Sequence, residues 1–240
     1  MNLTIQLILF VVSVVIGGGL VDLLKKKSTN IKLLLSFSGG FLLTIIFTHI
    51  LPESYSEIES TGYFILIGFF LQLVLEYFSK GAEHGHTHLH DVASHFPIAI
   101  FVSLSIHAFV EAIPINHGVG HAHVHAHDHF HMNDLYWGVF IHKIPVAVAL
   151  KTILDASGVS RKMSWVYLII FGLMAPFGLL FGEWILHSFG VSLSWLLAVA
   201  IGMFFHVSTT IIFESSEGHK INILKLMAIL AGFGVGILIG

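Results

Sequence analysis

The chain contains no cysteine, and only 10% of its 240 residues are charged. Without cysteine there is no disulfide framework and no thiolate metal site. A soluble globular domain has about 25% charged residues, so this composition excludes an ordinary soluble domain. P-loop, HExxH and GxSxG patterns are also missing, which removes the commonest sequence signs of nucleotide-driven or hydrolytic chemistry. We therefore expect no enzymatic activity and no bound cofactor.

Apolar residues dominate instead: 55% of the chain is hydrophobic and the mean hydropathy is +0.89. A run of about 20 apolar residues is long enough to cross the hydrocarbon core of a bilayer. We find eight such runs, at 3–24, 31–51, 62–79, 95–115, 135–154, 164–187, 191–213 and 221–240. This pattern predicts an all-α integral membrane protein with eight transmembrane helices, forming a single domain over residues 1–240.

Basic residues fall in alternate connections between these runs. They are Lys25, Lys26, Lys27, Lys32, Lys80, Lys151, Arg161, Lys162, Lys220 and Lys225. The connection after the second run carries Glu53, Glu57 and Glu59 instead. The positive-inside rule then places the basic connections in the cytoplasm and both termini outside. The compact chain favours a multi-pass protein of the bacterial inner membrane.

Ionisable residues inside two of the apolar runs are the strongest functional signal. His107 and Glu111 are four residues apart and therefore share one helix face, and His142 lies in the next run. A charged group at a helix centre in a membrane costs at least ~2.5–3.5 kcal/mol, so such residues are candidates for function. Imidazole and carboxylate together suit a borderline metal that must also be released. We predict a metal site formed by these three residues.

Two prolines lie beside this predicted site. Pro114 follows Glu111 by three residues, and Pro145 follows His142 by three. Proline lacks the N–H that would bond the carbonyl four residues earlier. We expect both helices to kink and to present freed carbonyls next to the predicted metal ligands.

Histidine is concentrated in two of the connections between runs. We predict a cytoplasmic histidine-rich loop at 81–94 and an external one at 116–134, both able to bind metal. The candidate ligands are His84, His86, His88 and His90 in the first loop and His121, His123, His125, His127 and His129 in the second.

Further polar residues lie near the ends of other runs. His49 and Glu53 share a face and are candidates for an entry site. Gln72 and Glu76 also share a face, and are either exit ligands or interfacial anchors. His206 is expected to form an interhelical hydrogen bond.

Taken in order, these motifs resemble the ZIP (Zrt-, Irt-like) family of divalent metal transporters. The shared motifs are His49-Ile-Leu-Pro52-Glu53, the H-x-x-x-E of His107 and Glu111, the H-x-x-P of His142 and Pro145, and Ala175-Pro176-Phe-Gly178. The resemblance implies a 3+2+3 bundle in which the fourth and fifth spans form the transport core. It also implies alternating access and movement of zinc toward the cytoplasm, with iron and manganese as other candidate substrates.

The chain departs from the usual family pattern at several positions. They are Ala108, Ala112, Lys143, Val146 and Ala175, where many members carry asparagine, glycine, an acid, a further ligand and an acid, respectively. These changes remove most ligands of a second metal, so the resemblance to an HKxP-type branch implies a single-metal site. Lys143 is expected to pair with Glu111, to reach the interface, or to replace the charge of the second metal.

Other functions remain open at this stage. A cation-diffusion-facilitator-like exporter also carries H-x-x-x-D helices, although such exporters usually have six spans and a soluble domain. An intramembrane metal-dependent hydrolase or a metal sensor would use the same ligands, and a measurement of metal flux separates the sensor from the other candidates. We expect divalent metal ions and the lipid bilayer as partners, expect no nucleic acid, and leave a homodimer open.

Overall fold

The computed structural model describes residues 2–23, 28–57, 59–79, 81, 97–115, 128–214 and 222–239, without the side chains of 28–30, 53, 57, 128–134 and 214. All regular structure in these residues is helical. The helices are α1 Leu3–Leu23, α2 Ser28–Ile45, η1 Ile46–Ile50, α3 Leu51–Glu57, α4 Thr61–Ser79, α6 Ile98–Val110, α7 Asp128–Ala156, α8 Arg161–Phe189, α9 Leu193–Glu214 and α10 Ile223–Ile239. The all-helical prediction is confirmed.

Six stretches in the described part of the chain are long and apolar enough to cross a membrane. They are Leu3–Leu23, Ile31–Ser56, Thr61–Ser79, Leu135–Ala156, Arg161–Phe189 and Leu193–Phe213. Two further apolar helices, α6 and α10, are shorter, with 13 and 17 residues. At 1.5 Å per residue, α6 spans only about 20 Å of a core that is about 30 Å thick. The full count of eight spans stays a prediction.

The second span is longer than its apolar run, because helix continues from α2 through η1 into α3. The segment η1 is a π-helical turn, and the Leu51 N–H bonds the Ile46 carbonyl five residues earlier. Pro52 follows directly and cannot donate to the carbonyl of Thr48. A π turn just before the proline accommodates this missing bond without ending the helix.

The fourth span ends its α-helix earlier than its apolar run predicts. Helix α6 stops at Val110, and residues 111–115 continue as turns. Pro114 cannot bond the Val110 carbonyl, and the Ile113 N–H bonds it instead at 3.2 Å. The expectation of a freed carbonyl at Val110 is therefore wrong. Helix α7, in contrast, runs through Pro145.

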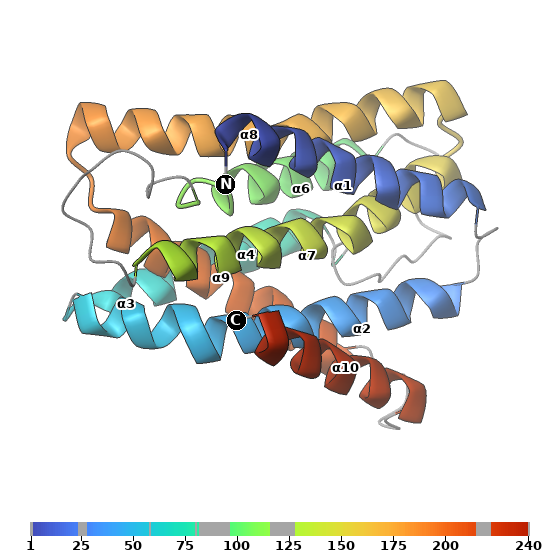
Figure 1. Ribbon diagram of the computed structural model, residues 1–240. Helices are drawn as coiled ribbons and strands as arrows, with labels where there is room; N and C mark the ends of the chain where they lie inside the picture. The colour runs from blue at the N-terminus through green and yellow to red at the C-terminus, as the bar shows by residue number, and fades with distance from the viewer. Residues whose placement is uncertain are drawn as a thin grey trace.

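The helices pack roughly parallel to one another in a bundle. Figure 1 shows α1 and α8 along its upper edge and α2 and α10 along its lower edge, with α4, α6, α7 and α9 between them. Helix α7 contacts α1, α2 and α8, and α6 contacts α4 and α8. The two helices that carry the predicted metal ligands therefore lie between elements from both ends of the chain.

Two glycines allow close helix packing, one of them at the end of α6. A Cβ at Gly178 of α8 would overlap the carbonyl oxygen of Phe109 in α6, and a Cβ at Gly68 of α4 would overlap the carbonyl oxygen of Val199 in α9. Small residues permit this approach of backbones in membranes. Gly178 thus allows α8 to pack directly against Phe109 at the end of α6, and Phe109 precedes Glu111 by two residues.

Candidate metal centre

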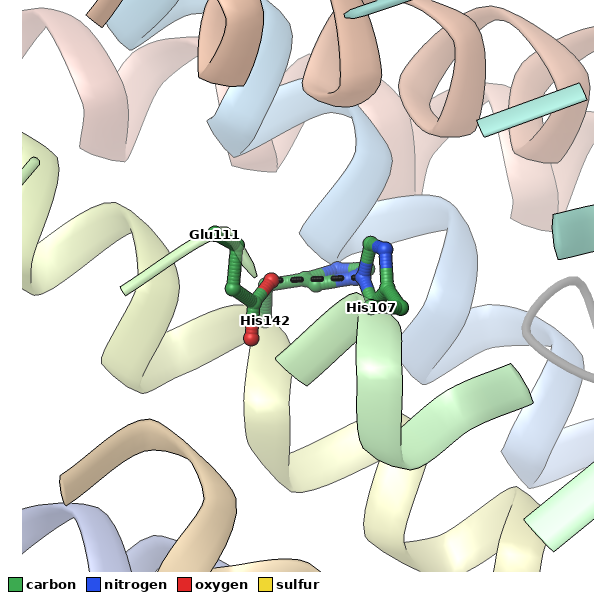
Figure 2. Close-up of side chains that lie close together, drawn as sticks. All are labelled: His107, Glu111 and His142. Atoms are coloured by element: carbon green, nitrogen blue, oxygen red, sulfur yellow. Dashed lines mark ion pairs between the residues drawn. The ribbon is translucent and has the colours of Figure 1, made fainter. Parts of the chain in front are cut away.

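The three predicted ligands come together in the interior of the bundle. Ligand atoms of His107, Glu111 and His142 all lie within 4.8 Å of one another. Each residue is no more than 1% exposed. Figure 2 shows the three side chains converging from α6 and α7. Among the residues that the structure describes, this is the one group of three or more metal-ligating side chains.

The end of α6 places its two ligands next to each other. His107 lies in the last turn of the helix, and Glu111 is its C-cap, with its N–H bonded to the His107 carbonyl at 3.0 Å. This spacing brings His107 Nε2 to 3.2 Å from Glu111 Oε2. The C-terminal end of a helix carries a partial negative charge. The α6 terminus therefore adds to the attraction of this position for a cation.

The other ring nitrogen of each histidine is held by a neighbouring helix. His107 Nδ1 lies 2.8 Å from Gln72 Oε1 in α4, and His142 Nδ1 lies 3.0 Å from Ser38 Oγ in α2. A metal-ligating histidine usually donates its second N–H to such a partner, which fixes the tautomer and the ring orientation.

The hydrogen bond to Gln72 determines which ring nitrogen of His107 carries the proton. An amide oxygen only accepts hydrogen bonds, so the neutral imidazole of His107 carries its proton on Nδ1. The lone pair of Nε2 then faces a carboxylate oxygen 3.2 Å away. Apart from this contact, neither of these two buried atoms has a hydrogen-bond partner among the described residues. Two acceptors facing each other are stabilised by a shared proton or by a cation between them, so the donor set fits a metal ion.

Lys143 pairs with Glu111, which is one of the three roles that the sequence allowed. Its ammonium group bonds Glu111 Oε1 and is itself buried. The same group lies 5.5 Å and 6.0 Å from the ring centres of Phe171 and Phe10. Oε1 of Glu111 therefore faces the ammonium group, while Oε2 faces Nε2 of His107.

The remaining predicted ligands are separate from this cluster or not described. His49 lies in η1, with Nδ1 2.7 Å from Thr48 Oγ1. Glu53 lies in α3, and its side chain is outside the described part. The histidines at 84, 86, 88, 90, 121, 123, 125 and 127 lie outside the described residues, as does the side chain of His129 in α7.

Sequence reasoning missed the contacts of Ser38 and Gln72 with the histidine rings. Ser38 gave no signal, since serine is common in membrane helices. Gln72 shares a face with Glu76, and both point toward polar partners: Gln72 to His107, and Glu76 to His206 in α9. The expected interhelical bond of His206 is confirmed.

The fold and the cluster define a polytopic membrane protein whose buried histidine and glutamate side chains could hold a metal ion. A family model of ZIP zinc transporters matches residues 83–240, and the chain belongs to this family. Divalent metal transport across a membrane is accordingly its class of activity, and the family consists of transporters rather than enzymes. In a search of curated proteins, none matches the chain.

Proposed function

We propose that the protein carries zinc, with iron and manganese as other candidate substrates, through a single site formed by His107, Glu111 and His142. The observation that carries this proposal is the meeting of the three ligand atoms within 4.8 Å in the bundle interior. Two nitrogens and one carboxylate oxygen bind zinc without the permanence of a thiolate site. A main-chain carbonyl or a water molecule would complete the coordination.

Lys143 supports a site for one metal rather than two. Its ammonium group occupies Oε1 of Glu111, where a second cation would otherwise bind. We propose that this fixed charge replaces the second metal, as expected of an HKxP-type member. Glu111 is then shared between a permanent cation and the transported one.

The site is enclosed, so transport requires the bundle to open to each side in turn. We propose alternating access, with α6 and α7 as the core of a 3+2+3 arrangement of eight spans. The alternating basic connections support termini on the outside and movement toward the cytoplasm. We place the protein in a bacterial inner membrane and leave a homodimer open.

Zinc uptake into proteoliposomes tests the site. A fluorescent zinc indicator is enclosed, and initial rates are measured for the wild type, His107→Ala and His142→Ala, with iron and manganese as competitors. His187→Ala is the matched control, since it removes an exposed histidine at the end of α8. We expect both site variants to lose uptake and the control to retain it.

Other outcomes distinguish the competing functions. Uptake that persists in both site variants, at normal levels of reconstitution, would show that the cluster is not the transport site. Absence of wild-type flux under several gradients, with zinc still bound, would favour a sensor. Flux in the outward direction alone would favour an exporter.

A further inference from the structure

The helices can be arranged in two groups that meet at two extensive junctions. Helices α6, α7, α8 and α1 form the first group through the contacts of α8 with α1, α6 and α7 and of α1 with α7. Helices α2, α4, α9 and α10 form the second through the contacts of α2 with α9 and α10 and of α4 with α9. The groups meet mainly where α2 contacts α7 and where α4 contacts α6.

All three proposed metal ligands belong to the first group, and both histidine partners belong to the second. Ser38 of α2 reaches His142 of α7 across one junction, and Gln72 of α4 reaches His107 across the other. Ser38 and Gln72 are both fully buried. The two hydrogen bonds therefore cross the two places where the groups meet.

We propose that Ser38 and Gln72 are positioning residues for the metal site: from the opposite helix group, they hold Nδ1 of the two histidines so that Nε2 of each binds the metal. The proposal rests on the proposed function of the cluster. It assigns these residues no contact with the metal. It makes the strength of metal binding depend on how the two helix groups are packed against each other.

The physical reason lies in the two tautomers of neutral imidazole. A partner that accepts from Nδ1–H leaves the lone pair on Nε2, where it can bind a metal. Without that partner, the proton moves freely between the nitrogens and the ring rotates about its side-chain bonds. If the helix groups move apart, both partners are withdrawn together, and the site loses affinity. This would favour release of the metal in a state in which the groups are displaced.

The test compares variants that remove each hydrogen bond with variants that keep it. Gln72→Met removes an amide oxygen that accepts from His107, and Ser38→Ala removes a hydroxyl that can accept from His142, while Ser38→Thr and Gln72→Glu retain an oxygen at each position. The chain offers matched controls. Ser36→Ala removes a buried serine of the same helix that bonds only the Lys32 carbonyl in the described contacts, and Gln6→Met removes a buried glutamine of α1.

Two readouts separate positioning from a structural role. The first is the zinc dependence of uptake: we expect KM to rise about 10- to 100-fold in Ser38→Ala and Gln72→Met while kcat stays near that of the wild type. The second is the nitrogen NMR spectrum of zinc-free protein labelled with ¹⁵N-histidine. The ring signals of His107 and His142, assigned from the two alanine variants, should show Nδ1–H in the wild type and a mixture of tautomers when the partner is removed.

Specific results would overturn the proposal. KM values of Ser38→Ala and Gln72→Met equal to those of Ser36→Ala and Gln6→Met, with unchanged tautomers, would show that the bonds do not position the rings. A fall in kcat with an unchanged KM would also contradict the proposal, because it would mean that the bonds affect the transport step and not the affinity for zinc. If Ser38→Ala or Gln72→Met fails to insert, a 10-fold or greater rise in KM together with mixed tautomers in Ser38→Thr or Gln72→Glu, which keep an oxygen, would also contradict it. Retained uptake in His107→Ala would instead contradict the proposed function itself.

Discussion

Glu111 has a different partner for each of its two carboxylate oxygens. Lys143 bonds Oε1, and His107 Nε2 approaches Oε2 at 3.2 Å. Both members of the ion pair are buried, so each relies on the other for compensation of its charge. Removing one partner of a buried ion pair typically costs ~3–5 kcal/mol, because the other charge is left without compensation. A bound divalent cation would supply that compensation from the other side of the carboxylate.

We predict that Lys143→Met destabilises the zinc-free protein and strengthens zinc binding. The ammonium group and the metal compete for the negative charge of Glu111. Removing the ammonium group therefore raises the affinity of the site for zinc. Thermal unfolding in detergent, with a chelator and then with zinc, measures both effects. The variant should unfold at a lower temperature than the wild type without zinc and show a larger upward shift with it.

The control for this prediction is Lys162→Met, which removes an exposed lysine near the start of α8. It should match the wild type under both conditions, because a surface charge contributes ~0–1 kcal/mol. Equal zinc-induced shifts in Lys143→Met and Lys162→Met would mean that Lys143 does not share Glu111 with a metal.

At the scale of helices, the site depends on where α6 ends and on what packs against that end. The helix stops at Val110, and the turns of 111–115 place Glu111 at the helix terminus. Helix α8 approaches this terminus through Gly178, where a Cβ would overlap the Phe109 carbonyl oxygen. The contact with a main-chain atom cannot be relieved by rotating a side chain. The motif Ala175-Pro176-Phe-Gly178 therefore supports the geometry of Glu111 through the backbone.

We predict that Gly178→Ala lowers both stability and transport. The added methyl group must push α8 away from α6, at a typical cost of ~1–3 kcal/mol for overpacking. Glycine to alanine at an open helical position instead gains roughly 0.5–1 kcal/mol. Gly19→Ala in α1 is the matched control, since a Cβ there meets nothing within 4 Å.

Thermal unfolding and zinc uptake of these two glycine variants provide the measurement. Gly178→Ala should unfold at a lower temperature and transport more slowly than Gly19→Ala. Identical behaviour of the two variants would show that the close approach of α8 to Phe109 is not required for the site.

At the scale of the whole molecule, the proposed function requires the enclosed cluster to exchange metal with both aqueous sides. The histidines of the predicted external loop, at 117, 121, 123, 125 and 127, precede the start of α7 at Asp128. Substituting them leaves this helix intact, whereas deletion up to residue 131 would remove its first turn. They can therefore be tested separately from the helices that carry the site.

We predict that replacing these five histidines with glutamine raises the apparent KM for zinc and leaves the maximal rate unchanged. Neutral imidazoles bind metal and release it as the pH falls through ~6.5. At low zinc concentration, the wild type should therefore take up zinc faster than the glutamine variant at pH 7.5, and the two rates should be equal near pH 5.5. Loss of the maximal rate, in normally inserted protein, would show that the loop is part of the transport path.

Much of this arrangement could be predicted, and the failures have identifiable causes. The candidate ligands His107, Glu111 and His142, which the structure brings together, were predicted from the cost of ionisable groups in a membrane and from helical spacing. The early end of α6 was missed because hydropathy continues to residue 115 while Pro114 changes the hydrogen bonding. The continuation of the second helix beyond residue 51 was missed because Pro52 suggests a boundary, and the π turn at Ile46–Ile50 accommodates it.

The sequence by itself determined that this chain is a helical membrane protein with metal-ligating residues on two helices, because hydropathy and helical periodicity are local properties. Only the tertiary structure decided that Lys143 pairs with Glu111 and that Ser38 and Gln72 hold the histidine rings. Those contacts join residues 32, 104 and 35 positions apart in the chain. No local pattern encodes them, since they arise from the way the two groups of helices pack.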